Sequence, residues 1–275
     1  MDYILGKDKI IIYNCEDFNI MHILECGQIF TYKKVADFEY EVYSKDKIAR
    51  VVFDGKKYVI LTSDVEYFVN FFDLSTDYRE IKRKLSEFDK MQDAIKFGYG
   101  IRILKQDLLE VIIGFVISAN NHIERIKKSM AKIRECGENM GSYYAFPTLA
   151  RLGQITETQF REFGCGYRAG YLVKLIKQLE HVDLEETKNW DKNKLKNWLL
   201  SLYGVGEKVC DCILLFGYNI CQSFPVDTWI EKVYVDLFHV TKPRDKMSKD
   251  LIEYFGDLSG YAQQYLFFYK RSKID

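Results

Sequence analysis

The spacing of apolar positions divides this 275-residue chain into two parts. Before about residue 65, Lys9–Tyr13 is apolar and β-branched, and Phe38–Tyr43 alternates between polar and apolar residues. Ile48–Thr62 has two apolar-rich arms around Asp54-Gly55, a dipeptide that accepts the positive φ of a type I′ hairpin turn. These segments predict an antiparallel sheet near the N-terminus.

After residue 65 the apolar period becomes helical. Residues 106–119 are apolar almost all round, which is typical of a helix that is buried on most sides. Further helical patterns cover 123–135, 168–181, 192–202, 208–217, 227–238 and 248–270. Strands followed by helices indicate an α+β fold. We therefore predict a twisted antiparallel sheet domain over residues 1–98, packed on a mostly α-helical domain over residues 99–275.

Composition narrows the class of protein. The 40 Lys and Arg balance the 40 Asp and Glu, so a nucleic-acid site would have to be a local feature of the surface. The seven cysteines are odd in number and form no C-x-x-C pair, which argues against a disulfide framework or a cysteine-rich zinc site. No signal peptide or membrane-spanning apolar run is recognisable. We expect a cytoplasmic protein, associated with the nucleoid if the source is prokaryotic.

The segment with the most chemical information runs from Leu202 to Asp227. Two predicted helices flank Gly204-Val205-Gly206. Paired glycines permit a tight turn whose backbone N–H groups approach an anion, and the next helix directs its N-terminus to the same place. A DNA phosphate fits such a site, although an ordinary turn between two helices would explain the glycines equally well.

Lys208 and Asp227 extend this picture. Lys208 falls in the first turn of the helix after the glycines, where the helix dipole opposes a cation and favours the neutral, nucleophilic amine. Asp227 ends the turn Phe224-Pro225-Val226 and stands at a predicted helix N-cap. A carboxylate there could be a plain cap, or it could stabilise a developing sugar cation or orient the amine.

The order L-x-G-V-G-x-K, a short helix and then P-V-D resembles the helix-hairpin-helix Gly/Pro-Asp motif of DNA glycosylases. In bifunctional members the lysine attacks the deoxyribose C1′ and expels the damaged base. The resulting Schiff base permits β-elimination and strand cleavage. The resemblance implies that Lys208 is the nucleophile and Asp227 its partner.

Further segments resemble one branch of that superfamily, the 8-oxoguanine DNA glycosylase/lyases. Cys26-Gly27-Gln28-Ile29-Phe30 resembles the family's G-Q-S-F segment, and Gly260–Phe267 resembles G-W-A-Q-x-x-L-F. The resemblance implies that the Gly27 carbonyl accepts from N7–H of the oxidised base, a hydrogen that guanine lacks. It also implies that the base is contacted by three side chains, those of Cys212, Gln263 and Phe267.

Two segments resemble the part of the family that reads the opposite strand. Ser118–Arg125 is similar to S-S-N-N-N-I-A-R, and Gly164–Ala169 is similar to G-L-G-Y-R-A. The resemblance implies that the orphaned cytosine is contacted by Asn120, Arg125 and Arg168, and that Tyr167 inserts into the duplex. The chain departs from the family at two positions: Trp229 stands where the animal enzyme has a phosphate-contacting histidine, and His122 replaces the third asparagine.

The same resemblance sets expectations for partners and cofactors. It implies duplex DNA carrying 8-oxoguanine opposite cytosine, a monomer and no required cofactor. A monovalent cation in the hairpin, held by the carbonyls of Leu200, Leu202 and Val205, is a hypothesis that fails if ion-dependent DNA affinity survives disruption of this loop. Related enzymes carry a four-cysteine iron–sulfur motif after the catalytic region. Here the last cysteine, Cys221, precedes Asp227, so we expect no such cluster.

Two other functions stay open on the sequence alone. A glycosylase for another oxidised or alkylated base would share the hairpin, although many alkylation enzymes have the aspartate without a lysine at the place of Lys208. A non-catalytic helix-hairpin-helix DNA-binding module would need neither Lys208 nor a base pocket. Full activity of a Lys208→Gln protein would favour an aspartate-only enzyme, whereas tight binding without activity on any damaged duplex would favour the module.

Overall fold

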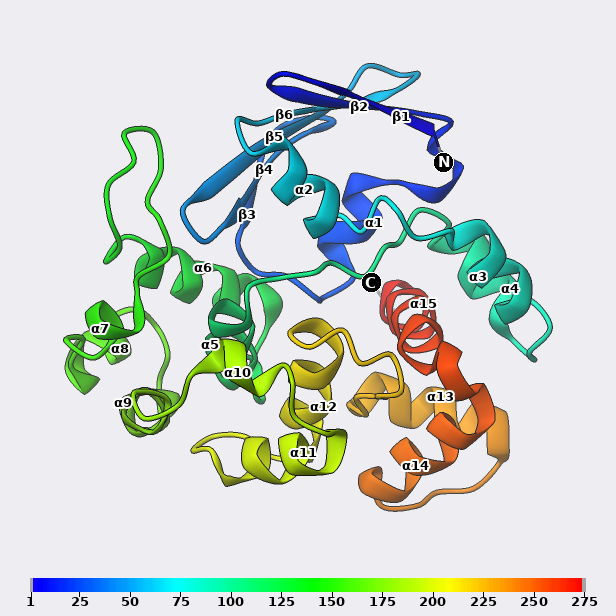
Figure 1. Cartoon of the computed structure of the whole chain (residues 1–275). Helices are drawn as coiled ribbons and strands as arrows, with labels where there is room; N and C mark the ends of the chain where they lie inside the picture. The colour runs from blue at the N-terminus through cyan, green and yellow to red at the C-terminus, as the bar shows by residue number, and fades with distance from the viewer. Residues whose placement is uncertain (1, 274–275) are drawn as a thin grey trace.

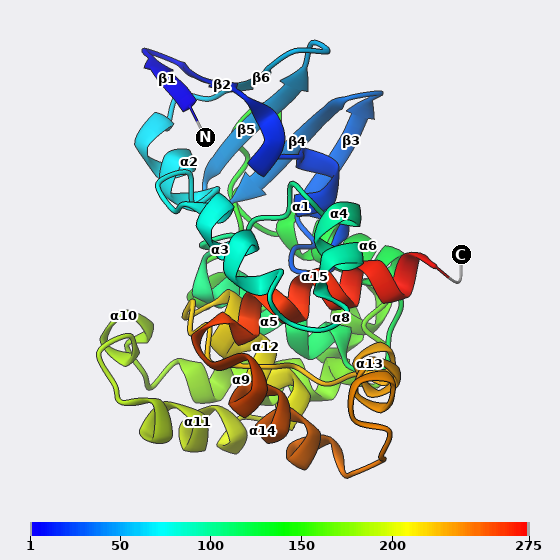
Figure 2. The same cartoon turned by 90° about the vertical axis from the view of Figure 1, so that its right-hand side faces the viewer.

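A computed structural model describes residues 2–273 and has the predicted α+β architecture (Figure 1). One antiparallel sheet has the strand order β1-β2-β6-β5-β4-β3. Its strands are β1 (Asp2–Gly6), β2 (Lys9–Tyr13), β3 (Tyr32–Ala36), β4 (Glu39–Ser44), β5 (Lys47–Phe53) and β6 (Tyr58–Leu61). The sheet lies at one end of the molecule and the helices fill the rest, as the rotated view also shows (Figure 2).

The helices follow in two groups. The first four along the chain are α1 (Ile20–Glu25), α2 (Val65–Phe71), α3 (Tyr78–Leu85) and α4 (Met91–Phe97). The remainder are α5 (Leu108–Ser118), α6 (Ile123–Arg134), α7 (Leu149–Leu152), α8 (Glu157–Glu162), α9 (Arg168–Leu179), α10 (Leu184–Thr187), α11 (Lys192–Ser201), α12 (Glu207–Phe216), α13 (Thr228–Phe238), α14 (Arg244–Phe255) and α15 (Ser259–Ser272). No helix within residues 2–273 is both long enough and apolar enough to cross a membrane.

The sheet forms because apolar residues alternate along its strands. Ile12, Val42, Val51 and Ile60 point to one face and are fully buried. They share a core with aromatic residues of α2 and of the segment before α1. β2, β4, β5 and β6 match the predicted strands, whereas β1 and β3, with less regular patterns, were not predicted.

The predicted two-residue turn at Asp54-Gly55 is wrong. Phe53 pairs with Tyr58, so the connection between β5 and β6 has four residues, 54–57. The Asp54 carboxylate accepts the backbone N–H groups of Lys56 and Lys57, each at 3.0 Å, and this side-chain turn replaces the type I′ geometry. Gly55 does have a positive φ of 92°.

The helical part is built around α5. As its sequence predicts, α5 is buried almost all round, and it packs against α6, α9 and α12. Its apolar side chains form the centre of the largest core of the molecule. This buried helix therefore fixes the positions of the helices that carry the predicted functional residues.

The pattern at 248–270 is not one helix, as predicted, but two. Gly256 adopts φ 56° and ψ −131°, a conformation that favours glycine, and it separates α14 from α15. The bend lets α15 return between the N-terminal helices and α13 (Figures 1 and 2). Tyr265 of α15 then shares a core with Met91 and Ala94 of α4. The division of the chain at residue 98 stays a prediction, because side-chain packing is continuous across it.

A buried arginine joins the segments on which the sheet and the helices meet. Arg102 is fully buried, and its guanidinium group lies 4.0 Å from the centre of the Tyr78 ring. It donates to four backbone carbonyls in two segments: that of Asp17 before α1, and those of Phe72, Asp73 and Thr76 between α2 and α3. Since a buried cation is stable only when its donors are satisfied, these carbonyls define where the segments lie.

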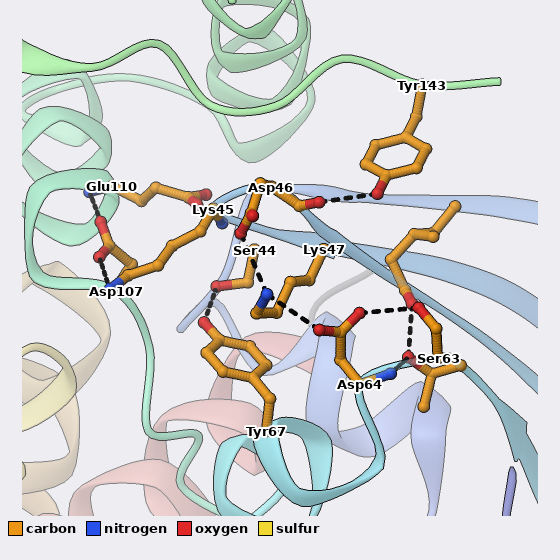
Figure 3. Close-up of polar contacts among 12 residues, drawn as sticks. Ser44, Lys45, Asp46, Lys47, Ser63, Asp64, Tyr67, Asp107, Glu110 and Tyr143 are labelled. Atoms are coloured by element: carbon orange, nitrogen blue, oxygen red, sulfur yellow. Dashed lines mark hydrogen bonds and ion pairs between the residues drawn. The ribbon is translucent and has the colours of Figure 1, made fainter. Parts of the chain in front are cut away.

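The tip of the β4–β5 hairpin is held to the helical part by a polar network (Figure 3). The Lys45 N–H donates to the Glu110 carboxylate at 2.5 Å, and the Tyr143 hydroxyl donates to the Asp46 carbonyl at 2.7 Å. Burial raises the pKa of Glu110, while the Arg134 guanidinium at 2.7 Å opposes that shift. The sheet is thus fixed at the hairpin tip as well as at Arg102.

We predict that Arg102→Met lowers the free energy of unfolding by at least about 3 kcal/mol, because four buried carbonyls lose their donor. Urea unfolding checks this value. Arg83→Met is the matched control, since Arg83 is an exposed arginine paired with Glu80 on α3 and its loss should leave the midpoint nearly unchanged. Equal midpoints for the two variants would contradict the proposed importance of Arg102.

Candidate active site

The glycine hairpin connects α11 to α12 as predicted. Its turn is closed by a hydrogen bond of 3.1 Å from the Val205 N–H to the Leu202 carbonyl. Gly204 has a φ of 83°, and a Cβ there would lie 2.9 Å from Val116 Cγ1 and 3.2 Å from the Tyr171 Cβ. Only glycine fits this position without strain.

Gly206 has a different part in the hairpin. Its φ of −100° is open to any residue, and a Cβ there would meet no atom within 4 Å. It is the N-cap of α12, and among residues 2–273 no side chain caps that helix end. The first N–H groups of α12 are therefore left for an anion.

The predicted cation ligands are the carbonyls of Leu200, Leu202 and Val205, at the end of α11 and in the turn. The Leu202 carbonyl already accepts one N–H and retains a second lone pair. The donor set is therefore compatible with a monovalent cation. The cation itself stays a prediction.

Lys208 projects from the first turn of α12 toward α5. Its Nζ lies 3.5 Å from the Ser118 hydroxyl oxygen and 5.5 Å from the centre of the Phe115 ring. Cys212 lies one turn further along α12 and is buried, and burial raises the pKa of its thiol to about 11. The thiol is therefore neutral near pH 7, and the amine is held between an aromatic face and a hydroxyl group.

Asp227 is held by the start of α13. Its Oδ1 accepts the N–H groups of Trp229 and Ile230 at 2.9 and 3.0 Å, which makes Asp227 the N-cap. Both bonds use Oδ1, so the cap does not require Oδ2. The carboxylate is thus fixed in place while one oxygen stays available for chemistry.

A buried contact connects the aspartate turn to the lysine helix. The Ser248 hydroxyl lies 2.9 Å from the Phe224 carbonyl and 3.2 Å from the Asp211 carboxylate. Burial raises the pKa of Asp211, on α12, to about 6, with the Lys196 ammonium opposing the shift. α14 therefore joins the segment before Asp227 to the helix that carries Lys208.

Lys208 and Asp227 line one cleft of about 810 Å³, a size suited to a ligand such as a flipped base. The cleft is lined from the N-terminal side by Gly27 and Phe30, and from α15 by Phe267. A Cβ on Gly27 would lie only 2.9 Å from the edge of the Phe267 ring. The cleft thus brings together residues from both ends of the chain.

Two predicted base-pocket residues lie behind the surface of this cleft. Cys212 and Gln263 are buried and are not among its lining residues. The Gln263 amide lies 3.5 Å from the Pro225 carbonyl and accepts from Gln264 at 2.7 Å. Their contacts with a base stay predictions.

Of the residues predicted to read the opposite strand, Asn120 lines this cleft, and Tyr167 and Arg168 approach the backbone of Ala119 and Asn120 beside it. Tyr167 is 52% exposed, while Asn120 follows α5 with a φ of 49°. A Cβ on Gly166 would lie 3.8 Å from Arg125 Nη2 and 3.9 Å from Arg168 Nη1, so both guanidinium groups lie near this glycine. Arg168 is 4% exposed and donates to the carbonyls of Asn120 and Ala119, which directly follow α5, at 2.6 and 2.7 Å. In this structure Arg168 therefore holds the turn after α5.

The structure adds residues that the sequence reasoning did not single out. Phe115 and Ser118 contact Lys208, and Ser118 belonged to a motif already recognised. Arg244 lines the cleft near Asp227 and forms two hydrogen bonds with Glu231, at 2.8 and 2.9 Å. Nothing in the sequence around Arg244 marked it, because its place depends on how α14 folds back.

Comparison with known proteins identifies the family. A family model described as the N-terminal domain of 8-oxoguanine DNA glycosylase matches residues 10–112. The structure also matches the Clostridium acetobutylicum 8-oxoguanine glycosylase/lyase, solved with duplex DNA containing cytosine opposite 8-oxoguanine. The TM-score is 0.92 and the identity 37%, over 100% of both chains. The chain belongs to the 8-oxoguanine DNA glycosylase/lyase family.

Curated relatives of this family are more distant. The N-glycosylase/DNA lyase OGG1 of Arabidopsis thaliana is 30% identical over 61% of this chain and 51% of its own length. A probable N-glycosylase/DNA lyase of Methanothermobacter thermautotrophicus is 28% identical over 77% of this chain and 75% of its own. The chain therefore spans about half of the plant protein. The predicted family and α+β fold are confirmed.

We predict that alanine substitutions at the two hairpin glycines have different effects on stability and on DNA binding. Gly204→Ala should lower the free energy of unfolding by about 1–2 kcal/mol, because alanine is strained at positive φ and contacts Val116. Gly206→Ala should leave unfolding unchanged and weaken duplex binding, because its methyl group enters the open space where a phosphate approaches. Thermal unfolding and fluorescence anisotropy separate the two effects. Equal losses of stability in both variants would contradict this assignment.

Proposed function

We propose that this enzyme excises 8-oxoguanine from duplex DNA and then cleaves the strand, with Lys208 as the nucleophile. Membership of the family makes the chain a bifunctional DNA glycosylase and lyase of base-excision repair. The observation that carries the assignment of residues is the single cleft that Lys208, Asp227, Gly27 and Phe267 share. We propose further that it works as a monomer in the cytoplasm, on the nucleoid if the organism is a prokaryote.

In the first step the neutral Lys208 amine attacks C1′ of the damaged nucleotide. The glycosidic bond breaks, and its electron pair and a proton leave with the base. The Ser118 oxygen, 3.5 Å from Nζ, is placed to accept a hydrogen bond from Nζ and so to orient the amine. Asp227, held by its two backbone bonds, stabilises the positive charge that develops at C1′.

In the second step the sugar ring opens: the C1′–O4′ bond breaks, O4′ takes up a proton, and the nitrogen lone pair turns the C1′–Nζ bond into an imine. The imine acidifies the hydrogen on C2′, and loss of that proton expels the 3′ phosphate by β-elimination. The hairpin, with the open first turn of α12, is suited to hold a backbone phosphate during both steps. Lys208 remains the only covalent link that this scheme requires.

Base selection is proposed to depend on Gly27 and Phe267. The Gly27 carbonyl would accept N7–H of 8-oxoguanine, and the Phe267 ring would stack on the base. Guanine has no hydrogen on N7, so it would leave this carbonyl without a donor. Cys212 and Gln263, which are buried behind the cleft surface in this structure, would complete the pocket by contacting the base.

We expect borohydride to trap wild-type enzyme on a duplex that carries 8-oxoguanine opposite cytosine. Lys208→Gln should lower the yield of adduct at least about a hundredfold, because no imine can form. Lys177→Gln is the control, since it removes an exposed lysine of α9 away from the cleft. Denaturing gel electrophoresis measures the adduct.

Each result of this experiment has a clear meaning. An adduct in wild type and in the control variant, but not in Lys208→Gln, supports the nucleophile and the lesion together. An adduct that persists in Lys208→Gln would refute the nucleophile. Intact lesion with wild-type enzyme would refute the substrate, and binding without cleavage of any damaged duplex would favour a DNA-binding module.

We also expect excision to be fastest opposite cytosine, by about tenfold or more, because another base would not satisfy the Arg125 guanidinium group. Arg168 would have to release the Ala119 and Asn120 carbonyls before it could contact the cytosine. Arg125→Met should reduce this preference. Lys128→Met, an exposed cation on the same helix, should not. Single-turnover rates on four duplexes decide the matter, and equal rates opposite all four bases would refute the proposed cytosine contacts.

A further inference from the structure

Arg271 lies beside the proposed base pocket without belonging to any motif recognised in the sequence. It follows Phe267 by one turn of α15, so the two side chains share a face of the helix. The carbon of its guanidinium group lies 5.2 Å from the centre of the Phe267 ring. The aromatic ring is thus in contact with a cation on α15 itself.

The same guanidinium group reaches the other wall of the pocket. Its Nη2 donates to the carbonyl of Glu25, the last residue of α1 and two residues before Gly27. A cation at the C-terminus of a helix is favourable, and this bond fixes the start of the turn that carries Gly27. Arg271 therefore links the Gly27 turn to the Phe267 ring.

The third contact is with Gly27. A Cβ on Gly27 would lie 3.5 Å from Arg271 Nη1, and it would lie 2.9 Å from the Phe267 ring. Nη1 is buried and has no hydrogen-bond partner among the described residues. An unpaired buried N–H is unfavourable for stability, so stability alone does not explain an arginine at this position.

We propose that Arg271 is a positioning residue, which sets the separation between the Gly27 carbonyl and the Phe267 ring and so determines recognition of the oxidised base. This inference rests on the proposed function. Arg271 acts through those two residues, because its Nη1 is covered and a base cannot touch it. A methionine would fill similar space but would release both the α1 carbonyl and the cation over the ring.

The two reactions of the enzyme separate this role from a general structural one. Excision of 8-oxoguanine needs Lys208 and an intact base pocket. Cleavage at a preformed abasic site needs Lys208 and the hairpin, but there is no base to hold. Loss of a residue that positions the pocket should therefore lower the rate of 8-oxoguanine excision and leave the rate of abasic-site cleavage unchanged.

The experiment compares Arg271→Met, Arg271→Lys and Lys273→Met. Lys273 is the matched control, because its ammonium lies 4.2 Å from the centre of the Tyr269 ring, also one turn earlier, on the exposed side of α15. Borohydride trapping on abasic duplex counts the active molecules of each preparation. Single-turnover rates are then measured on 8-oxoguanine opposite cytosine and on the abasic duplex.

We expect Arg271→Met to lower the excision rate about tenfold or more, since small misplacements of a bound group have effects of this size. Its rate on abasic duplex should stay within about twofold of wild type. Arg271→Lys should recover part of the excision rate, because an ammonium can still reach the Glu25 carbonyl but cannot also cover the ring. Lys273→Met should match wild type in both reactions.

Equal losses on the two substrates, or no loss on either, would overturn the proposal. If Arg271→Met does not fold, the test uses Arg271→Lys. Its rate of 8-oxoguanine excision must then fall while its rate on abasic duplex stays that of wild type. Failure of the proposed function is distinguishable, because wild-type enzyme would then cleave abasic duplex while leaving 8-oxoguanine in place.

Discussion

The structure depends on how buried polar groups are satisfied where the sheet meets the helices. Arg102 directs its donors to carbonyls of two segments, the one before α1 and the one between α2 and α3. Gln28 complements it from the N-terminal side: its amide donates to the carbonyls of Ile23 and Arg102 at 2.9 and 2.7 Å and accepts the Leu104 N–H at 2.9 Å. Since buried polar groups without partners destabilise a fold, few arrangements of these segments are possible. Gly27 precedes Gln28 directly, so its position is determined by the same bonds.

The groups proposed to react, Lys208 and Asp227, are positioned by helix ends. Lys208 lies in the first turn of one helix and Asp227 caps another, and both helices pack on cores that α5 and α15 help to form. The amine and the carboxylate therefore belong to the rigid helical part, whereas the glycine that would test N7 belongs to the segment beside the sheet. The proposed base contacts come from both parts of the fold, since Gly27 lies beside the sheet and Phe267 lies on α15, and they meet Lys208 and Asp227 in one cleft.

The sequence predicted the elements with strong local patterns and the residues within contiguous motifs. The buried helix α5, the glycine hairpin and the cap at Asp227 follow from short-range spacing. The edge strands β1 and β3 did not, because exposed strands alternate weakly, and the break at Gly256 was hidden by an apolar pattern that continues through it. Arg244 and Arg271 could not be predicted either, since their neighbours come from distant segments. The burial of Cys212 and Gln263 behind the cleft likewise depends on packing that no local pattern encodes.

The bend at Gly256 also affects the order in which the parts of the proposed site fold. Because α15 returns to the first helices, the pocket pairs residue 27 with residue 267, which are far apart in the sequence. Contacts of such long range form slowly, and during synthesis this one must wait until residue 267 has left the ribosome. A nascent chain thus holds Lys208 before it holds the ring proposed to stack on the base. We expect discrimination between damaged and normal guanine to be acquired after the hairpin and the lysine helix have folded.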